Sequence, residues 1–98
     1  TEDEEYLNIL FRNLKILNQN KYDFIFYVAG VDIHFEDRLG KLKITDAGVN
    51  KRDQIVIDNF NRKNIPLCGV LGGGYNKSFE KLIELHSMLH KNCAEIIR

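Results

Sequence analysis

The chain has 98 residues, and its 14 basic and 14 acidic side chains cancel near neutral pH. A chain of this length forms one domain at most, with a modest core. Because no net positive field exists to attract phosphates, we expect no direct binding of nucleic acid or of anionic membranes. The apolar runs are far shorter than the roughly 20 residues of a membrane span.

No charged leader with a hydrophobic stretch opens the sequence. We therefore expect a cytoplasmic protein, or a nuclear one if the source is eukaryotic. Cys68 and Cys93 lack a C-x-x-C partner and are interpreted as buried, reduced thiols. The chain begins at Thr1 and not at a methionine, which suggests that it is part of a longer product.

The first 20 residues have the pattern of an amphipathic helix. Thr1 and Glu4 have the T-x-x-E spacing of a capping box. Apolar residues then recur at three- and four-residue intervals: Leu7, Leu10, Phe11, Leu14 and Leu17. The next segment, YDFIFYVAG at 22–30, is rich in aromatic and β-branched residues and predicts a strand buried on both faces, as in parallel sheets.

The second half predicts another helix, a strand and a last helix. Thr45 is placed to cap a helix that runs to about Arg62, and Asn64 and Pro66 mark its end. LCGVLG at 67–72 predicts a second buried strand, and residues 75–98 predict a third helix. The expected core positions of the first of these helices are Ala47, Val49, Ile55, Val56 and Phe60. The apolar residues of the last helix recur at helical spacing, namely Phe79, Leu82, Ile83, Leu85, Met88 and Leu89.

The predicted order is helix, strand, helix, strand, helix, which is typical of an α/β fold with parallel strands and a right-handed crossover. Two parallel strands alone would both be edges with unpaired backbone groups. We therefore expect further strands from another part of the same protein or from a partner chain.

Chemistry is expected in the loops that follow the strands, because open α/β sheets bind ligands beyond the carboxyl ends of their strands. Asp32 is a candidate metal ligand or base there, and alternatively a turn aspartate that bonds nearby backbone amides. Tyr75 is a candidate donor to a developing oxyanion, and alternatively a ring that packs on the last helix. The two loops, 30–40 and 72–75, would lie side by side.

Three glycines at 72–74 permit positive φ angles and a close approach to a ligand. They could cradle a phosphate at a helix N-terminus, but they match neither the G-x-G-x-x-G nor the P-loop pattern. The sequence therefore gives only weak support to a nucleotide-binding module.

We interpret the histidines and the remaining charges of the first loop as solvated or bracing groups and not as metal ligands. His86 and His90 have the spacing of shared metal ligands, but the glutamate of the zincin motif is absent, so a solvated helix face is favoured. His34, Glu36 and Asp37 are interpreted as parts of a solvated loop. Asp37 and the adjacent Arg38 are expected to brace that loop by hydrogen bonds and ion pairing.

Two segments carry a family resemblance: GVDIHFEDRLGKLKITDAG at 30–48 and PLCGVLGGGY at 66–75. Together they resemble the C-terminal part of the histone deacetylase superfamily, zinc-dependent enzymes of the arginase/deacetylase fold. TEDEEYL, EDRLGKLKIT and AGVNKRDQIV look most like the class IV histone deacetylases and their bacterial relatives. The resemblance implies a three-layer α/β/α fold, of which residues 1–98 would be the incomplete C-terminal portion of a single catalytic domain.

The resemblance also implies roles for individual residues. Asp32 matches the last ligand of the family's Asp/His/Asp zinc site, and Tyr75 matches the tyrosine that stabilises the tetrahedral intermediate. Leu39, Gly73 and Gly74 match positions along the acyl-lysine tunnel. The implied reaction is hydrolysis of the amide of acetyl- or acyl-lysine, or of a related acylated amine, by a zinc-activated water.

The sequence also departs from the family pattern. The D-x-H segment with the two other zinc ligands and the paired histidines upstream of it are not in residues 1–98, so the zinc site of this chain is incomplete. Two functions stay open. One is the C-terminal segment of a zinc-dependent deacylase, completed by the remainder of the domain in the same or another chain and acting on an acyl-lysine protein or a small acylated amine. The other is a non-catalytic remnant that serves as a folding or interaction module.

Overall fold

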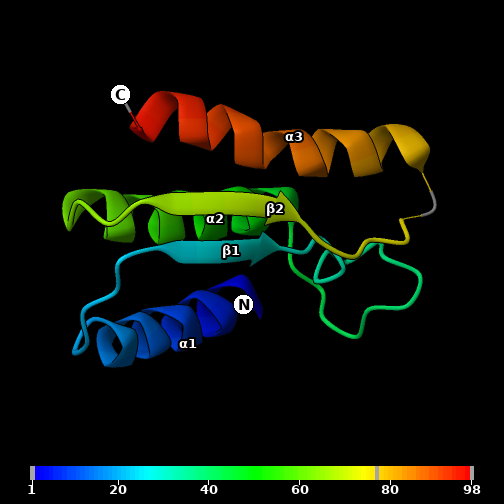
Figure 1. Ribbon diagram of the computed structural model, residues 1–98. Coiled ribbons are helices and arrows are strands. Elements are labelled where there is room, and N and C mark those ends of the chain that lie inside the picture. Colours follow the sequence, from blue (N-terminus) through cyan, green and yellow to red (C-terminus); the bar gives the residue numbers. More distant parts are fainter. Residues whose placement is uncertain (1, 77, 98) are drawn as a thin grey trace.

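A computed structural model of the chain describes residues 2–76 and 78–97. It is a small α/β unit whose elements follow the predicted order: α1 (Glu2–Leu17), β1 (Ile25–Ala29), α2 (Asp46–Arg62), β2 (Leu67–Leu71) and α3 (Phe79–Ile96) (Figure 1). The two strands pair in parallel, from Ile25 opposite Leu67 to Ala29 opposite Leu71. The predicted parallel pairing is therefore confirmed. Among the described residues, no helix is long and apolar enough to cross a bilayer.

Local sequence explains both ends of α2. The hydroxyl of Thr45 accepts a hydrogen bond from the backbone N–H of Gly48 at 3.1 Å, which confirms the predicted cap. Asn64 has a φ of 57°, in the left-handed region that asparagine tolerates. The N–H of Ile65 then bonds the carbonyl of Phe60 at 3.0 Å, and the chain turns directly toward β2. The capping box predicted for α1 involves Thr1, which lies outside the described residues.

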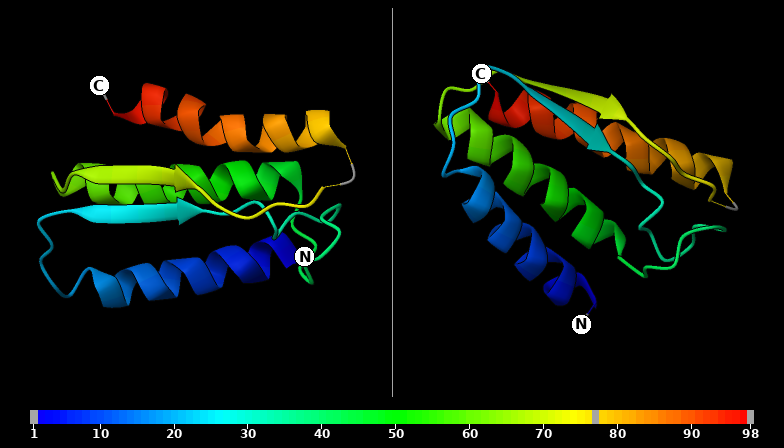
Figure 2. Two further views of the ribbon diagram at one scale, coloured as in Figure 1. Left: turned by 45° about the vertical axis from the view of Figure 1, so that its right-hand side comes forward. Right: turned by 60° about the horizontal axis from the view of Figure 1, so that its bottom comes forward.

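The three helices lie on one face of the sheet, with α2 behind the strands and α1 and α3 on either side of it (Figures 1 and 2). Alternate residues of β1 face these helices, namely Ile25, Tyr27 and Ala29. The buried hydrophobic residues are Leu14, Ala29, Val31, Ile44, Val49, Val56, Ile57, Phe60, Leu85 and Leu89. The core thus fills the space between one sheet face and the helices.

The apolar patterns of the helices do not coincide with the buried residues. Ala47, a predicted core position, is exposed, and the prediction is wrong for it. Four residues at apolar helical spacing are also exposed, Phe11, Leu17, Phe79 and Ile83, whereas Ile57, which the helical pattern did not single out, is fully buried. Apolar spacing marks a stripe along each helix, but this chain covers only part of each stripe.

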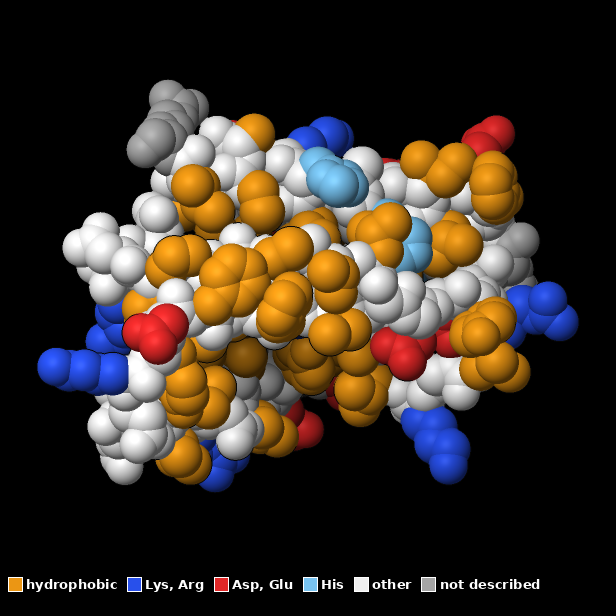
Figure 3. All heavy atoms as spheres, viewed as in Figure 1, with side chains coloured by type: hydrophobic (Ala, Val, Ile, Leu, Met, Phe, Trp, Pro, Cys, Tyr) orange, Lys and Arg blue, Asp and Glu red, His pale blue; other side chains and the backbone are white. Residues whose placement is uncertain are grey.

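The other face of the sheet is bare. Phe26 and Val28 on β1 are 73% and 67% exposed, and the residues that pair with them on β2, Cys68 and Val70, are also exposed. Figure 3 shows hydrophobic side chains gathered across this face of the molecule. The expectation of strands buried on both faces is therefore wrong for this chain, because no element of the described residues covers the second face. Cys68 is exposed, contrary to the expectation of a buried thiol, whereas Cys93 is partly buried.

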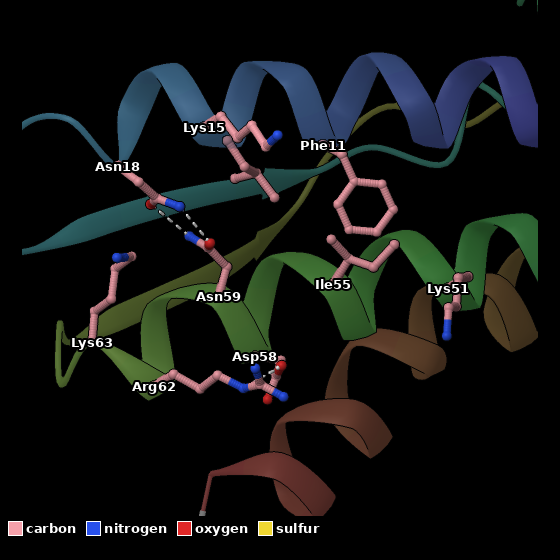
Figure 4. Close-up of a pocket in the computed structure, with 10 residues that line it drawn as sticks. Phe11, Lys15, Asn18, Lys51, Ile55, Asp58, Asn59, Arg62 and Lys63 are labelled. Atoms are coloured by element: carbon pink, nitrogen blue, oxygen red, sulfur yellow. Dashed lines mark hydrogen bonds and ion pairs between the residues drawn. The ribbon is translucent and has the colours of Figure 1, made fainter.

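A cavity of about 680 Å³ lies between α1 and α2. Phe11 and Ile55 line it, and Asn18 and Asn59 close one end through two reciprocal hydrogen bonds of 2.8 and 3.0 Å (Figure 4). Its walls come from helices, away from the loops that follow the strands. Because catalytic loops in α/β folds lie at the carboxyl ends of strands, we place the candidate site at those loops and not in this cavity.

Candidate functional site

The loops after β1 and β2 lie side by side, as predicted. The N–H of Val31 donates to the carbonyl of Gly73 at 3.0 Å, and the N–H of Arg38 donates to the carbonyl of Tyr75 at 3.0 Å. Asp37 and Asn76 form an isolated antiparallel bridge. The two loops therefore form one surface at the carboxyl edge of the sheet.

Close packing explains Gly72 and Gly74 on this surface. A Cβ on Gly72 would lie 2.8 Å from the Cα of Gly30, and a Cβ on Gly74 would lie 2.6 Å from a methyl of Val31. All seven glycines lie among the described residues, and none of them has a positive φ. Gly72 and Gly74 are thus needed for close packing around the two loops, whereas a Cβ on Gly73 would meet its nearest neighbour only at 3.7 Å. The positive φ angles that the run was expected to permit are not used.

Asp32 lies just beyond β1 with its side chain exposed. Its carboxylate oxygens lie over Gly30 and Gly73, 3.2 and 3.7 Å from where Cβ atoms on those glycines would be. Its backbone is packed tightly, because a Cβ on Gly40 would lie only 1.9 Å from the Asp32 carbonyl oxygen. In the described part of the chain, the carboxylate accepts none of the backbone hydrogen bonds that a turn aspartate would need.

Asp37 is the aspartate that binds backbone amides. One carboxylate oxygen accepts from the N–H of Tyr75 at 2.5 Å, and the other accepts from Leu39 at 3.0 Å and Gly40 at 2.7 Å. Burial raises the pKa of Asp37, but these three hydrogen bonds outweigh it and hold the pKa below its usual range. The residue is buried, so its interpretation as part of a solvated loop is wrong, whereas its bracing role is confirmed.

Arg38 contributes differently from what the sequence suggested. Its backbone N–H joins the two loops, but among the described residues its guanidinium forms no ion pair with Asp37. The bracing of the loop therefore comes from carboxylate-to-amide hydrogen bonds and from backbone pairing.

His34 is fully buried and not solvated, contrary to expectation. Its Nε2 lies 2.5 Å from a carboxylate oxygen of Asp46, and its Nδ1 lies 3.3 Å from the side-chain nitrogen of Asn76. The other oxygen of Asp46 accepts from Nζ of Lys81 at 2.6 Å. The Lys81 hydrogen bond, with a smaller contribution from His34, outweighs burial and lowers the pKa of Asp46. His34 thus ties the first loop to α2 and, through Asp46, to α3.

The proposed substrate-facing side chains are open to solvent. Tyr75 is 57% exposed, while its backbone is held by Asp37 and Arg38. Leu39 is exposed beside the same Asp37 carboxylate, which holds its N–H. Asp37 therefore connects the two segments that carry these side chains.

Sequence reasoning missed a buried ion pair next to the site. Arg52 and Asp53 are adjacent on α2 and both buried, and Arg52 bonds the carbonyl of Gly30, two residues before Asp32. A signal was present in the sequence, because positions 52 and 53 fall on the same helical stripe as the core residues Val49 and Val56. Charged residues on a core stripe are buried only when paired.

The two histidines of α3 have different surroundings. His90 is exposed, as expected. His86 is partly buried against Gly74, and its Nδ1 has no hydrogen-bond partner among the described residues, so the solvated-face interpretation is wrong for it. Burial, and then the charges of Arg52 and His90, lower the pKa of His86.

Within residues 2–76 and 78–97, no three His, Cys, Asp or Glu side chains are grouped to hold a metal ion. In the described part of the loop that follows β1, Asp32 offers an exposed carboxylate close to the end of the strand, and Glu36 offers another further along.

Comparison with known proteins identifies the family of the chain. Residues 1–89 match the histone deacetylase domain. The chain belongs to the histone deacetylase family. Members of this family are generally zinc-dependent.

Two known proteins are similar in sequence to this chain. An uncharacterized protein of Picosynechococcus sp. (strain ATCC 27264 / PCC 7002 / PR-6) is 41% identical over 96 residues, which are 97% of this chain and 32% of that protein. Histone deacetylase 2 of Arabidopsis thaliana is 39% identical over 84 residues, 85% of this chain and 22% of that protein. The chain therefore spans about a third or less of the relatives that it matches.

Proposed function

We propose that the chain is the C-terminal portion of a zinc-dependent deacylase domain, which hydrolyses the amide of acetyl- or acyl-lysine or of a related acylated amine. The observation that carries the proposal is the joined pair of loops at the carboxyl ends of β1 and β2. In a chain of the histone deacetylase family, they hold Asp32 and Tyr75 on one edge of the sheet, with exposed side chains on fixed backbones.

The roles follow from the chemistry of these residues. Asp32 supplies one carboxylate ligand, which fits an exposed group with no hydrogen bond of its own in the described part of the chain. When bound, zinc supplies polarisation of the acyl carbonyl and an activated water. The Tyr75 hydroxyl donates to the oxyanion that forms. Leu39, Gly73 and Gly74 border the path of the acyl chain.

The proposal includes the remainder of the domain as a partner, in the same or another chain. A catalytic zinc needs about three protein ligands, of which Asp32 is one. The bare sheet face around Phe26 and Val28 supports this partner, because contiguous apolar surface of this kind marks an interface. In this proposal, further strands pair with the sheet edges and a further layer covers the bare face, which completes a three-layer α/β/α arrangement.

A second candidate is a non-catalytic remnant that binds a partner through the same sheet face. The exposed apolar side chains of Phe26 and Val28 on that face favour it, because they offer a surface for a partner whether or not a metal binds. It differs from the first candidate in one measurable respect, since it requires neither zinc nor the Tyr75 hydroxyl.

The test uses the natural polypeptide that carries this chain, purified with zinc and assayed on an acetyl-lysine peptide. Tyr75→Phe should lower kcat by roughly 10²–10³-fold with zinc content unchanged, whereas Asp32→Asn should lower zinc content. Tyr22→Phe and Asp23→Asn are matched controls outside the site and should behave as the wild type. Full activity in Tyr75→Phe would defeat the assignment, and activity that is insensitive to chelation would defeat the metal mechanism.

A further inference from the structure

The peptide unit that joins Gly30 to Val31 is held from both sides. Its carbonyl oxygen accepts a hydrogen bond from Nη1 of Arg52. Its N–H donates to the carbonyl of Gly73 at 3.0 Å. This peptide unit lies one residue before Asp32, so its orientation sets the direction in which the Asp32 Cα leaves the strand.

Arg52 is itself fixed within the core. Its Nε and Nη2 both donate to the same carboxylate oxygen of Asp53, at 3.1 and 3.0 Å. The hydroxyl of Tyr27 donates to that oxygen at 2.5 Å, and the guanidinium carbon lies 5.7 Å from the centre of the Tyr27 ring. Arg52 and Asp53 are only 5% and 1% exposed. The donor that reaches Gly30 is therefore held by groups from both α2 and β1.

The charge states of Arg52 and Tyr27 favour these hydrogen bonds. Burial lowers the pKa of Arg52, but Tyr27 and Asp53 outweigh it and raise the pKa, so the guanidinium stays protonated. Burial is the main cause that raises the pKa of Tyr27, which keeps its hydroxyl a donor to Asp53. A buried charge with these partners has little freedom to reorient.

We propose that Arg52 is a positioning residue for Asp32, which acts through the Gly30 carbonyl. The inference rests on the proposed function of Asp32 as a zinc ligand. Asp32 is exposed and has no side-chain hydrogen bond within the described residues, so its direction depends on its backbone. Gly30 has no side chain to limit rotation of the adjoining peptide unit. The hydrogen bond from Arg52 limits this rotation at the carbonyl end, and the hydrogen bond to Gly73 limits it at the N–H end.

The guanidinium group of Arg52 forms a set of hydrogen bonds that a lysine cannot replace. One nitrogen reaches the Gly30 carbonyl while two others bind Asp53, a fork that a lysine ammonium cannot reproduce. Loss of a group that orients a metal ligand typically weakens metal binding by roughly 10–100-fold. We expect this loss for Arg52→Met, and a smaller but measurable loss for Arg52→Lys, which keeps a cation beside Asp53.

The test uses the natural polypeptide with Arg52→Met, Arg52→Lys and the control Arg62→Met. Arg62 lies on the same helix but is 78% exposed. Zinc dissociation constants come from chelator competition, hydrogen exchange is followed at the amides of residues 30–33, and unfolding in urea measures global stability. Both Arg52 variants should bind zinc more weakly per folded molecule and exchange these amides faster than the control.

Wild-type zinc affinity and wild-type exchange at residues 30–33 in folded Arg52→Met would overturn the inference. If that variant does not fold, Arg52→Lys decides in the same way, because it preserves the charge that Asp53 needs. A wild-type protein that binds no zinc would defeat the proposed function. Faster exchange at residues 30–33 in the Arg52 variants would then still support the backbone clamp, and unchanged exchange would overturn it.

Discussion

Asp37→Asn tests whether one buried carboxylate holds the two loops of the site together. In the wild type, one oxygen accepts from the N–H of Tyr75, and the other accepts from Leu39 and Gly40. An asparagine has nearly the same shape but only one acceptor oxygen. If that oxygen keeps the bonds to Leu39 and Gly40, the amide NH₂ faces the N–H of Tyr75.

The expected cost follows from the bonds lost. A hydrogen bond to a charged group contributes about 1.5–3 kcal/mol, and a donor left unpaired in a buried place carries its own penalty. We therefore expect Asp37→Asn to lower the free energy of unfolding by about 2–3 kcal/mol at neutral pH. The variant Asp37→Ala should cost more, because it leaves all three backbone donors without their acceptor.

The effect should also depend on pH, with a defined sign. The folded pKa of Asp37 is lowered, so the unfolded chain takes up the proton first as the pH falls below the ordinary value of about 3.9. The stabilisation by Asp37 is complete above that range and is lost as the pH falls through the folded pKa. The difference between wild type and Asp37→Asn should therefore shrink in acid. Asp46, whose pKa is also lowered, is present in both proteins and cancels from the difference.

Urea unfolding of the natural polypeptide, followed between pH 7 and pH 3, measures these quantities. Asp23→Asn is the matched control, since Asp23 is exposed and outside the loops. A loss in Asp37→Asn no larger than in this control would refute the bracing role. A difference that stays constant down to pH 3 would refute the electrostatic part of the reasoning.

Three further predictions follow from the packing of the loops and from the zinc site. Gly40→Ala should destabilise the fold strongly, because its Cβ would lie 1.9 Å from the Asp32 carbonyl oxygen. Gly73→Ala should be tolerated, because its Cβ would have its nearest neighbour at 3.7 Å. Equal free energies of unfolding for the two variants in urea would contradict this prediction. His34→Leu removes the side-chain contacts with Asp46 and Asn76 and the hydrogen bond from the Glu36 N–H, and should cost about 2–3 kcal/mol in urea unfolding. The exposed His90→Leu should change stability by less than about 0.5 kcal/mol. The 98-residue chain alone should bind zinc weakly and leave an acetyl-lysine peptide intact, so robust hydrolysis with added zinc would oppose the incomplete-site proposal.

The chemistry of the two loops shows where sequence reasoning failed. Asp37 and His34 looked like solvated charges because each lies in a polar run. Their partners include Tyr75 and Asn76, about 40 positions further along the chain. Arg52 and Asp53 were missed for a similar reason, since their burial depends on Tyr27 and Gly30 from another element. A local pattern shows which groups carry charge but not which of them the fold brings together.

The sequence by itself determined the order of the elements, the parallel pairing of the strands and the caps of α2. These depend on residue spacing and on contacts within a few residues, such as the Thr45 hydroxyl with the Gly48 N–H. The rule that loops after parallel strands meet at one edge also placed Asp32 and Tyr75 on the same surface.

Only the tertiary structure decided which apolar stripes are covered and which charges are buried. It also showed that Gly72 is needed for close approach to the backbone of Gly30, and Gly74 for close approach to the side chains of Val31 and Leu82, and neither for positive φ. The physical reason is that burial is a property of the surfaces that meet. Phe26 and Ile57 are both apolar, but one lies on the bare face of the sheet and the other between sheet and helices.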